Sequence, residues 1–201
     1  MKIKRTCYNK YHIHNGSNHS SRRGPSSFGM HDSKLAFECI KIQEGDTFLD
    51  LGCGAGDYSL YAAKLVGESG SVYSLDIGEE MLEGIRSDAE KSGLKNICTM
   101  VADVFKLLPV KEESVDVCMI ATVLHYKNIL DKTGVLFGEI RRVLKRGGRL
   151  AIIECKKEEM PFGPPLEFRV APEELDKALF LYGFKKIDYV DLGVNYMVLF
   201  E

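Results

Sequence analysis

The chain has 201 residues, of which 45% are hydrophobic and 28% are charged. This length is typical of about one domain, and the composition is typical of a folded globular protein rather than a disordered, collagen-like or coiled-coil chain. The apolar runs fall short of the ~18 residues that cross a bilayer. The first residues lack the apolar segment of a secretory signal. We therefore expect no membrane-embedded or exported segment.

Charge is unevenly distributed along the chain. Residues 1–31 contain six basic residues, no acidic residue and four of the five histidines, so they carry +6 and the remainder carries −8. We expect residues 1–27 to form a basic, His-rich arm that precedes a domain of residues 28–201. Such an arm is either a solvated tail or a segment that is attracted to the acidic body and folds over its ligand-binding cleft, where it would help to bind an anionic ligand.

The six cysteines are scattered and form no C-x-x-C pair. Most lie in or beside apolar runs, where a cysteine usually acts as a small buried side chain, and we expect reduced thiols in a cytoplasmic protein. Cys7 and the histidines at 12, 14 and 19 follow no spacing typical of a zinc site. The sequence therefore predicts no metal site.

From residue 47 onward, short apolar segments alternate with amphipathic ones. The pattern predicts strands at 47–51, 71–76, 96–101, 115–121, 149–154, 186–190 and 196–200, with helices at 57–66, 79–92 and 131–145 and from Pro172. Gly93 and Gly147 are expected to cap two of these helices. The alternation predicts a mostly parallel sheet covered on both faces, and the last two strands are too close for a helical crossover, so they must pair antiparallel.

A glycine-rich segment, Asp50 to Asp57 (DLGCGAGD), joins the first of these strands to a helix. Glycines allow a positive φ and close approach of a ligand, and the helix N-terminus behind them favours a negatively charged group. Asp50 adds a carboxylate that suits a cationic group on the same ligand. A dinucleotide-binding turn is disfavoured, because Asp57 stands where such a turn has its last glycine or alanine. A nucleotide-binding P-loop is excluded, because no Gly-Lys-Ser/Thr follows.

The D-x-G-x-G-x-G pattern resembles motif I of the class I S-adenosylmethionine-dependent methyltransferases. Further similar motifs follow in the family's order: Asp76 after the second strand, residues 102–104 (ADV) after the third, the strand 115–121, and residues 142–150 (RVLKRGGRL), where Arg146 replaces the usual proline. The chain looks most similar to the small-molecule group that includes the ubiquinone and menaquinone C-methyltransferases. This resemblance implies an α/β, Rossmann-like, seven-stranded sheet of order 3-2-1-4-5-7-6, with strand 7 antiparallel and helices on both faces.

The resemblance also implies S-adenosylmethionine as the cofactor. Asp76 would hold the two ribose hydroxyls, Ile77 and Met81 would flank the adenine, and Asp103 would meet the adenine amine. The implied cofactor-binding residues are Asp50, Gly52, Cys53, Gly54, Gly56, Asp76, Ile77, Met81, Ala102, Asp103, Val104 and Ala121.

Methyl transfer from a sulfonium needs mainly alignment of the acceptor and exclusion of water, and it needs a general base only if the acceptor must lose a proton early. His125, after the fourth strand, is the candidate base, and a loop residue without a chemical role is the alternative. The long loop at 156–171 leaves the ligand-binding edge of the sheet. The candidate substrate-binding residues are Phe28, Tyr126, Glu154, Glu167 and Arg169.

The resemblance implies a small-molecule methyl acceptor. Nucleic acid is a poor match because the body of the chain is acidic and contains no Trp. Two other functions remain open at this point. One is a non-catalytic, cofactor-binding regulatory subunit, and the other is methylation of a nucleic acid or a protein. The sequence does not indicate the acceptor atom or an oligomeric state.

Overall fold

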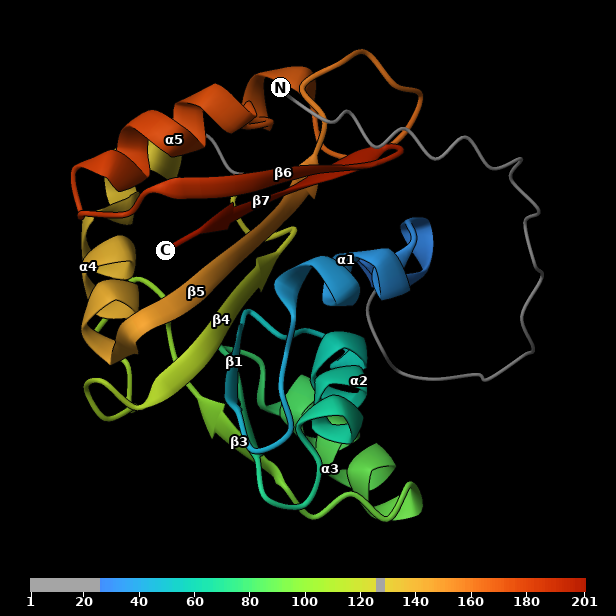
Figure 1. The fold of residues 1–201 in the computed structure, drawn as a ribbon. Helices are drawn as coiled ribbons and strands as arrows, with labels where there is room; N and C mark the ends of the chain where they lie inside the picture. The colour runs from blue at the N-terminus through green and yellow to red at the C-terminus, as the bar shows by residue number, and fades with distance from the viewer. Residues whose placement is uncertain (1–25, 126–128) are drawn as a thin grey trace.

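The structure is a computed structural model that describes residues 26–125 and 129–201. Its strands are β1 (Thr47–Leu51), β2 (Ser71–Asp76), β3 (Ile97–Val101), β4 (Val115–Ala121), β5 (Leu144–Cys155), β6 (Lys186–Leu192) and β7 (Asn195–Phe200). They form one seven-stranded sheet of order β3-β2-β1-β4-β5-β7-β6 (Figure 1). Strand β7 runs antiparallel to β5 and β6, and the other neighbours pair in parallel. The predicted order and direction of the strands are confirmed.

Helices cover both faces of the sheet (Figure 1). The α-helices are α1 (Ser33–Ile40), α2 (Asp57–Val66), α3 (Glu79–Lys91), α4 (Thr133–Val143) and α5 (Pro172–Phe180), and the 3₁₀ helices are η1 (Ser27–Met30), η2 (Ile129–Lys132) and η3 (Leu166–Phe168). Helices α1 and α2 bury their apolar residues against one face, and α4 and α5 bury theirs against the other. No helix among residues 26–125 and 129–201 is long and apolar enough to cross a membrane.

The central strands are apolar on both sides because both faces are covered. Along β5, Leu150 and Ile152 belong to the α4–α5 side of the core, whereas Ala151 and Ile153 belong to the α1–α2 side. All four side chains are fully buried. This period of two explains why these strands appear in the sequence as continuous apolar runs rather than as alternating patterns.

The glycine cap predicted after α3 and the start predicted for α5 at Pro172 are confirmed, but the cap predicted after α4 is not. Gly93 follows α3 with φ +68°, and the amide of Leu94 donates to the carbonyl of Ala89, as in a glycine-capped helix end. Helix α4 ends at Val143, four residues before Gly147. The cap predicted at Gly147 is wrong because Leu144 already pairs with Val115 as the start of β5, and Gly147, with φ +73°, lies in the irregular part of that strand.

The carboxyl ends of β1, β2, β4 and β5 lie at one edge of the sheet, because these strands are parallel. The glycine-rich turn follows β1, and the predicted site segments around Asp76, residues 102–104, His125 and Glu154 lie at the carboxyl ends of β2, β3, β4 and β5, since β3 is also parallel to β2. In open α/β sheets, ligands bind outside the carboxyl ends of the strands. The fold therefore brings together motifs that are separated by up to a hundred residues in the chain.

Candidate functional site

The turn between β1 and α2 requires glycine for two different reasons. Gly52, Gly54 and Gly56 all have positive φ, of +71°, +48° and +80°. A Cβ on Gly56 would lie 2.3 Å from Cγ1 of Ile85, whereas a Cβ on Gly54 would meet no atom within 4 Å. Gly56 therefore allows α3 to pack closely behind the turn, and Gly54 leaves the opposite face of the turn open.

Asp76, at the end of β2, binds the turn directly. Its Oδ2 accepts a hydrogen bond of 2.9 Å from the amide of Gly54, and its Oδ1 accepts one of 2.9 Å from the amide of Gly78. The residue remains partly exposed. Since each carboxylate oxygen accepts more than one hydrogen bond, Asp76 retains acceptor capacity next to the open face of Gly54.

Asp50 and Cys53 lie behind the turn rather than on its open face. Asp50 is 1% exposed, and Oγ of Ser59 donates to its Oδ2 at 2.6 Å. Burial raises the pKa of the Asp50 carboxyl to about 7, and the hydrogen bond from Ser59 opposes this shift. Cys53 is buried against Leu82 and Ile85. Asp50 thus ties the end of β1 to α2, and a direct contact with a ligand cation stays a prediction.

The loops after β2 and β3 lie side by side. The amide of Ala102 donates to the carbonyl of Asp76 at 2.9 Å. Ile77 is 73% exposed. Asp103 is partly exposed, and its Oδ1 accepts from the amide of Phe105. Of the remaining predicted residues here, Met81 is partly exposed, whereas Ala102 and Val104 are buried.

The strand end next to the glycine turn carries Ala121, Thr122 and His125. Thr122 has φ +55°, a conformation that a non-glycine residue adopts only when its surroundings enforce it. Nδ1 of His125 lies 3.3 Å from Oε2 of Glu154, which extends from the end of β5. The predicted base and one predicted substrate residue are therefore in direct contact. Tyr126 lies outside the described residues.

These features fit S-adenosylmethionine. The open face at Gly54, the acceptor oxygens of Asp76 and the exposed side chain of Ile77 match the polar amino-acid part, the ribose diol and the flat adenine ring of that molecule. A family model described as a methyltransferase domain matches residues 42–182.

The chain belongs to the methyltransferase domain family.

Individual relatives agree with this assignment. The ubiquinone/menaquinone biosynthesis C-methyltransferases UbiE of Haemophilus ducreyi and Escherichia coli O1:K1 / APEC are 34% and 35% identical to this chain over 133 residues. That alignment covers 65% of this chain but only 50% and 52% of those proteins. The chain thus spans about half the length of these curated relatives.

A crystal structure of an S-adenosylmethionine-dependent methyltransferase from Aquifex aeolicus is 33% identical with a TM-score of 0.78, over 89% of this chain and 93% of that one. The predicted family and fold are confirmed, and S-adenosylmethionine is the cofactor of this family. The fold is also shared with the [4+2]-cyclase SpnF, at 24% identity and a TM-score of 0.67, over 80% of this chain and 58% of that one.

The short helix η1 packs against α2 and contacts the residue that follows β4. The ring of Phe28 packs on Tyr58 and Tyr61 of α2, with centroid distances of 5.0 and 5.7 Å. Ser27 is buried, and its Oγ lies 3.1 Å from the hydroxyls of both Tyr58 and Thr122. Phe28 therefore contributes to the attachment of η1 to α2. Residues 1–25, most of the predicted arm, lie outside the described residues.

The sequence did not indicate the residues that complete this attachment. His31 follows η1, and its Nε2 lies 3.2 Å from the hydroxyl of Tyr58, while its Nδ1 lies 2.9 Å from the side-chain nitrogen of Asn195. A neutral imidazole satisfies both contacts by accepting at Nδ1 and donating at Nε2. Burial lowers the pKa of His31 to about 4, and the nearby Asp32 opposes this shift.

We expect His31 to make the fold less stable below about pH 6.5. Between its unfolded pKa near 6.5 and its folded pKa of about 4, the unfolded chain binds the proton and the folded chain does not, so stability falls as the pH drops. This titration lowers the free energy of unfolding by roughly 2 kcal/mol at pH 5, compared with neutral pH. Asp50, whose pKa is raised, acts in the opposite direction. Urea unfolding of the wild type and His31→Gln at pH 7.5 and pH 5 isolates the contribution of His31, and an equal pH dependence in the two proteins would contradict it.

The loop after β5 is held from inside by Arg169. This side chain is buried, with 4% exposed, and its guanidinium donates to the carbonyls of Lys156, Glu158, Phe162 and Pro164. Glu154 is buried as well, whereas Glu167 is exposed. Of the three predicted substrate residues in this region, Glu167 is thus open to solvent, and Arg169 maintains the shape of the loop.

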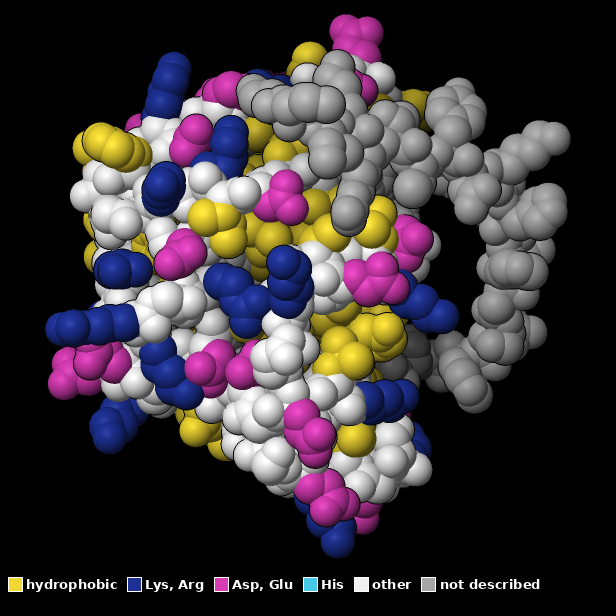
Figure 2. Space-filling view, viewed as in Figure 1, with side chains coloured by type: hydrophobic (Ala, Val, Ile, Leu, Met, Phe, Trp, Pro, Cys, Tyr) yellow, Lys and Arg dark blue, Asp and Glu magenta, His cyan; other side chains and the backbone are white. Residues whose placement is uncertain are grey.

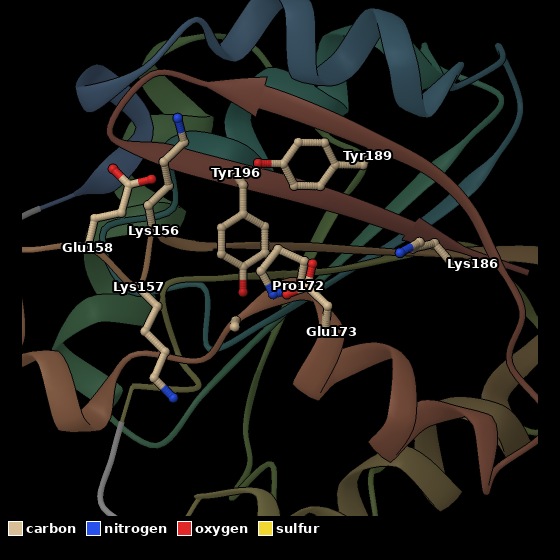
Figure 3. Close-up of a pocket in the computed structure, with 9 residues that line it drawn as sticks. Lys156, Lys157, Glu158, Pro172, Glu173, Lys186, Tyr189 and Tyr196 are labelled. Atoms are coloured by element: carbon tan, nitrogen blue, oxygen red, sulfur yellow. The ribbon is translucent and has the colours of Figure 1, made fainter. Parts of the chain in front are cut away.

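Two hollows border this loop. One, of about 620 Å³, is a shallow, open hollow lined by residues 158–166 and Arg169 of the loop itself. The other, of about 370 Å³, lies between the loop, the start of α5 and the β6–β7 hairpin (Figure 3). Its three lysines are paired with acids: Lys156 with Asp191 at 2.7 Å, Lys157 with Glu174 at 2.9 Å, and Lys186 with Asp176 at 3.5 Å. The second hollow therefore offers little uncompensated positive charge.

Proposed function

We propose that this chain transfers a methyl group from S-adenosylmethionine to a small-molecule acceptor. The observation that carries the proposal is the glycine turn whose open face, at Gly54, is hydrogen-bonded to the partly exposed carboxylate of Asp76. Membership in the methyltransferase domain family supports the reaction. The names of the UbiE relatives support a small-molecule acceptor, since those proteins act in quinone biosynthesis.

Each part of the site has a separate task in this proposal. Asp76 holds the ribose hydroxyls, while Ile77 and Met81 cover the adenine and Asp103 accepts from its amine. S-adenosylmethionine, when bound, supplies a methyl group on a positively charged sulfur. Asp50 lies close to this region, and its carboxyl favours that charge when it is ionised. The fixed loops after β1, β2 and β4 align the reactants, which is most of what this reaction requires of a protein.

The acceptor approaches from the side of the β5 loop and η1. The open loop hollow of about 620 Å³ is lined by Met160, Phe162 and several prolines as well as by Glu158 and Glu159, so both apolar and acidic side chains border this approach. On the face seen in Figure 2, lysine and arginine side chains are interspersed with aspartate and glutamate. This mixed surface suits a small acceptor better than a nucleic acid, which favours a continuous basic face.

The shared fold of SpnF shows why fold alone does not decide the reaction, and a cofactor-binding protein without turnover is the alternative to test. Calorimetry with S-adenosylmethionine, S-adenosylhomocysteine and NAD should give micromolar binding of the first two and none of NAD, because Asp57 would place a carboxylate beside a dinucleotide pyrophosphate. Transfer of a labelled methyl group to a panel of phenols, amines, carboxylic acids and thiols then tests turnover. NAD binding without S-adenosylmethionine binding would overturn the proposal.

A further inference from the structure

Glu154 is a buried glutamate whose two oxygens both serve the loop after β4. It lies at the carboxyl end of β5, opposite Tyr196 of β7, and is 1% exposed. Its Oε1 accepts a hydrogen bond of 2.6 Å from the amide of Leu124, and its Oε2 lies 3.3 Å from Nδ1 of His125. A charged side chain this deeply buried is rare unless it is paired, so its partners indicate its role.

The loop that Glu154 contacts is fixed at the residues that precede His125. The amide of Thr122 donates to the carbonyl of Ile153 at 2.8 Å, and Leu124 is fully buried. Thr122 keeps its left-handed backbone within this framework. His125 is therefore held in place by the backbone hydrogen bond of Thr122, the buried side chain of Leu124 and the carboxylate of Glu154. It lies next to the strand ends that border the cofactor site.

The contact with Glu154 also selects a tautomer of His125. An ionised carboxylate accepts hydrogen bonds and donates none, so Nδ1 of His125 must carry the proton between them. In a neutral imidazole the other nitrogen, Nε2, then has the lone pair. This arrangement of carboxylate and imidazole orients a histidine for proton transfer at Nε2.

We propose that Glu154 is a positioning residue that holds His125 in the Nδ1–H tautomer, with Nε2 as the group that takes a proton from the methyl acceptor. The inference rests on the proposed function. When S-adenosylmethionine is bound, the acceptor atom forms a bond to its methyl carbon while the carbon–sulfur bond breaks and leaves its electron pair on sulfur. The proton released by the acceptor passes to Nε2, and the carboxylate of Glu154 stabilises the resulting imidazolium.

The tautomer can be measured in the cofactor-free protein. We expect ¹⁵N-histidine spectra at pH 8, where an ordinary imidazole is neutral, to show the Nδ1–H tautomer for His125, with the resonance assigned from the His125→Asn variant. In Glu154→Gln, the amide oxygen can keep the bond to the amide of Leu124, so the NH₂ group faces Nδ1. The proton then moves to Nε2, and the ¹⁵N spectrum of this variant should show the Nε2–H tautomer of His125.

The same variants should separate proton transfer from cofactor binding. With hydroquinone as the acceptor, a proton must leave whether the new bond forms at carbon or at oxygen. Glu154→Gln and His125→Asn should each lower kcat by about 10²- to 10⁴-fold, the usual contribution of a general base, with the S-adenosylmethionine Kd unchanged within about twofold. Glu90→Gln, the same chemical change at an exposed position of α3, should behave like the wild type.

Two results would overturn the inference. One is an Nε2–H tautomer in the wild type, which is measured without any substitution and therefore does not depend on the folding of a variant. The other is a folded Glu154→Gln protein that methylates hydroquinone at the wild-type rate. If the wild type binds S-adenosylmethionine but leaves hydroquinone unmethylated, the proposed acceptor class fails, and the tautomer measurement still decides the role of Glu154.

Discussion

Replacing Asp76 with alanine is expected to weaken S-adenosylmethionine binding by about 10- to 150-fold while the sheet remains folded. The substitution removes hydrogen bonds from the ribose to a charged acceptor, which are worth about 1.5 to 3 kcal/mol. It also removes the acceptor of the Gly54 and Gly78 amides, which shapes the open face of the turn. Isothermal calorimetry measures the affinity, and urea unfolding monitors the fold.

Asp116→Ala is a matched control for this experiment. Oδ2 of Asp116 accepts from the amide of Thr47 at 2.8 Å, so it also holds a backbone N–H through a carboxylate, but at the opposite, amino end of β1. Its side chain also pairs with Lys145 at 2.7 Å. Asp116→Ala should lower stability without changing the affinity for S-adenosylmethionine. Unchanged affinity in a folded Asp76→Ala protein would show that other groups hold the ribose.

Alanine at two glycines of the turn should have opposite consequences. Gly56→Ala is expected to destabilise the fold by about 2 to 5 kcal/mol, because it combines an unfavourable left-handed backbone with a collision. The new Cβ would lie 2.3 Å from Cγ1 of Ile85, which is fully buried in α3 and has little room to move. Urea unfolding followed by circular dichroism measures this loss.

Gly54→Ala should instead preserve the fold and lower the S-adenosylmethionine affinity by more than about tenfold, the equivalent of about 1.4 kcal/mol. Its Cβ would meet no protein atom within 4 Å, so it enters the space proposed for the ligand. Gly93→Ala serves as the control, because Gly93 has φ +68° and an equally open Cβ position at the end of α3. A Gly54→Ala protein that binds like Gly93→Ala would show that the ligand does not approach this face.

Some features of this protein can be read from local sequence because neighbouring residues determine them. The alternation of apolar strands and amphipathic helices, the glycine at position 93 after α3 and the proline at the start of α5 all depend on residues within a few positions of one another. The motifs at the ends of β1 and β2 also appear in the sequence, because parallel strands place consecutive loops at the same edge.

The partners of the buried charged residues were decided only by the tertiary structure. In the sequence, Glu154 at the end of a predicted strand and Arg169 in the loop that follows look like exposed residues, since such side chains are mostly exposed. Glu154 instead meets a loop that lies 29 to 30 positions earlier in the chain, because β4 and β5 are neighbours in the sheet, and Arg169 turns inward to bind four carbonyls of its own loop.

Helix α4 and the segment around His31 also combine features that local sequence determines with features that contacts between distant segments determine. The period of α4 is clear in the sequence, but its end is set by the pairing of Leu144 with Val115, a contact across the sheet that local propensity does not contain. His31 is polar and lies in a polar segment, yet it is held between Tyr58 and Asn195, which lie 27 and 164 positions away. Local periodicity and turn chemistry thus determined the elements and the glycine turn, whereas packing between distant segments determined which charged and polar groups are buried and what each of them contacts.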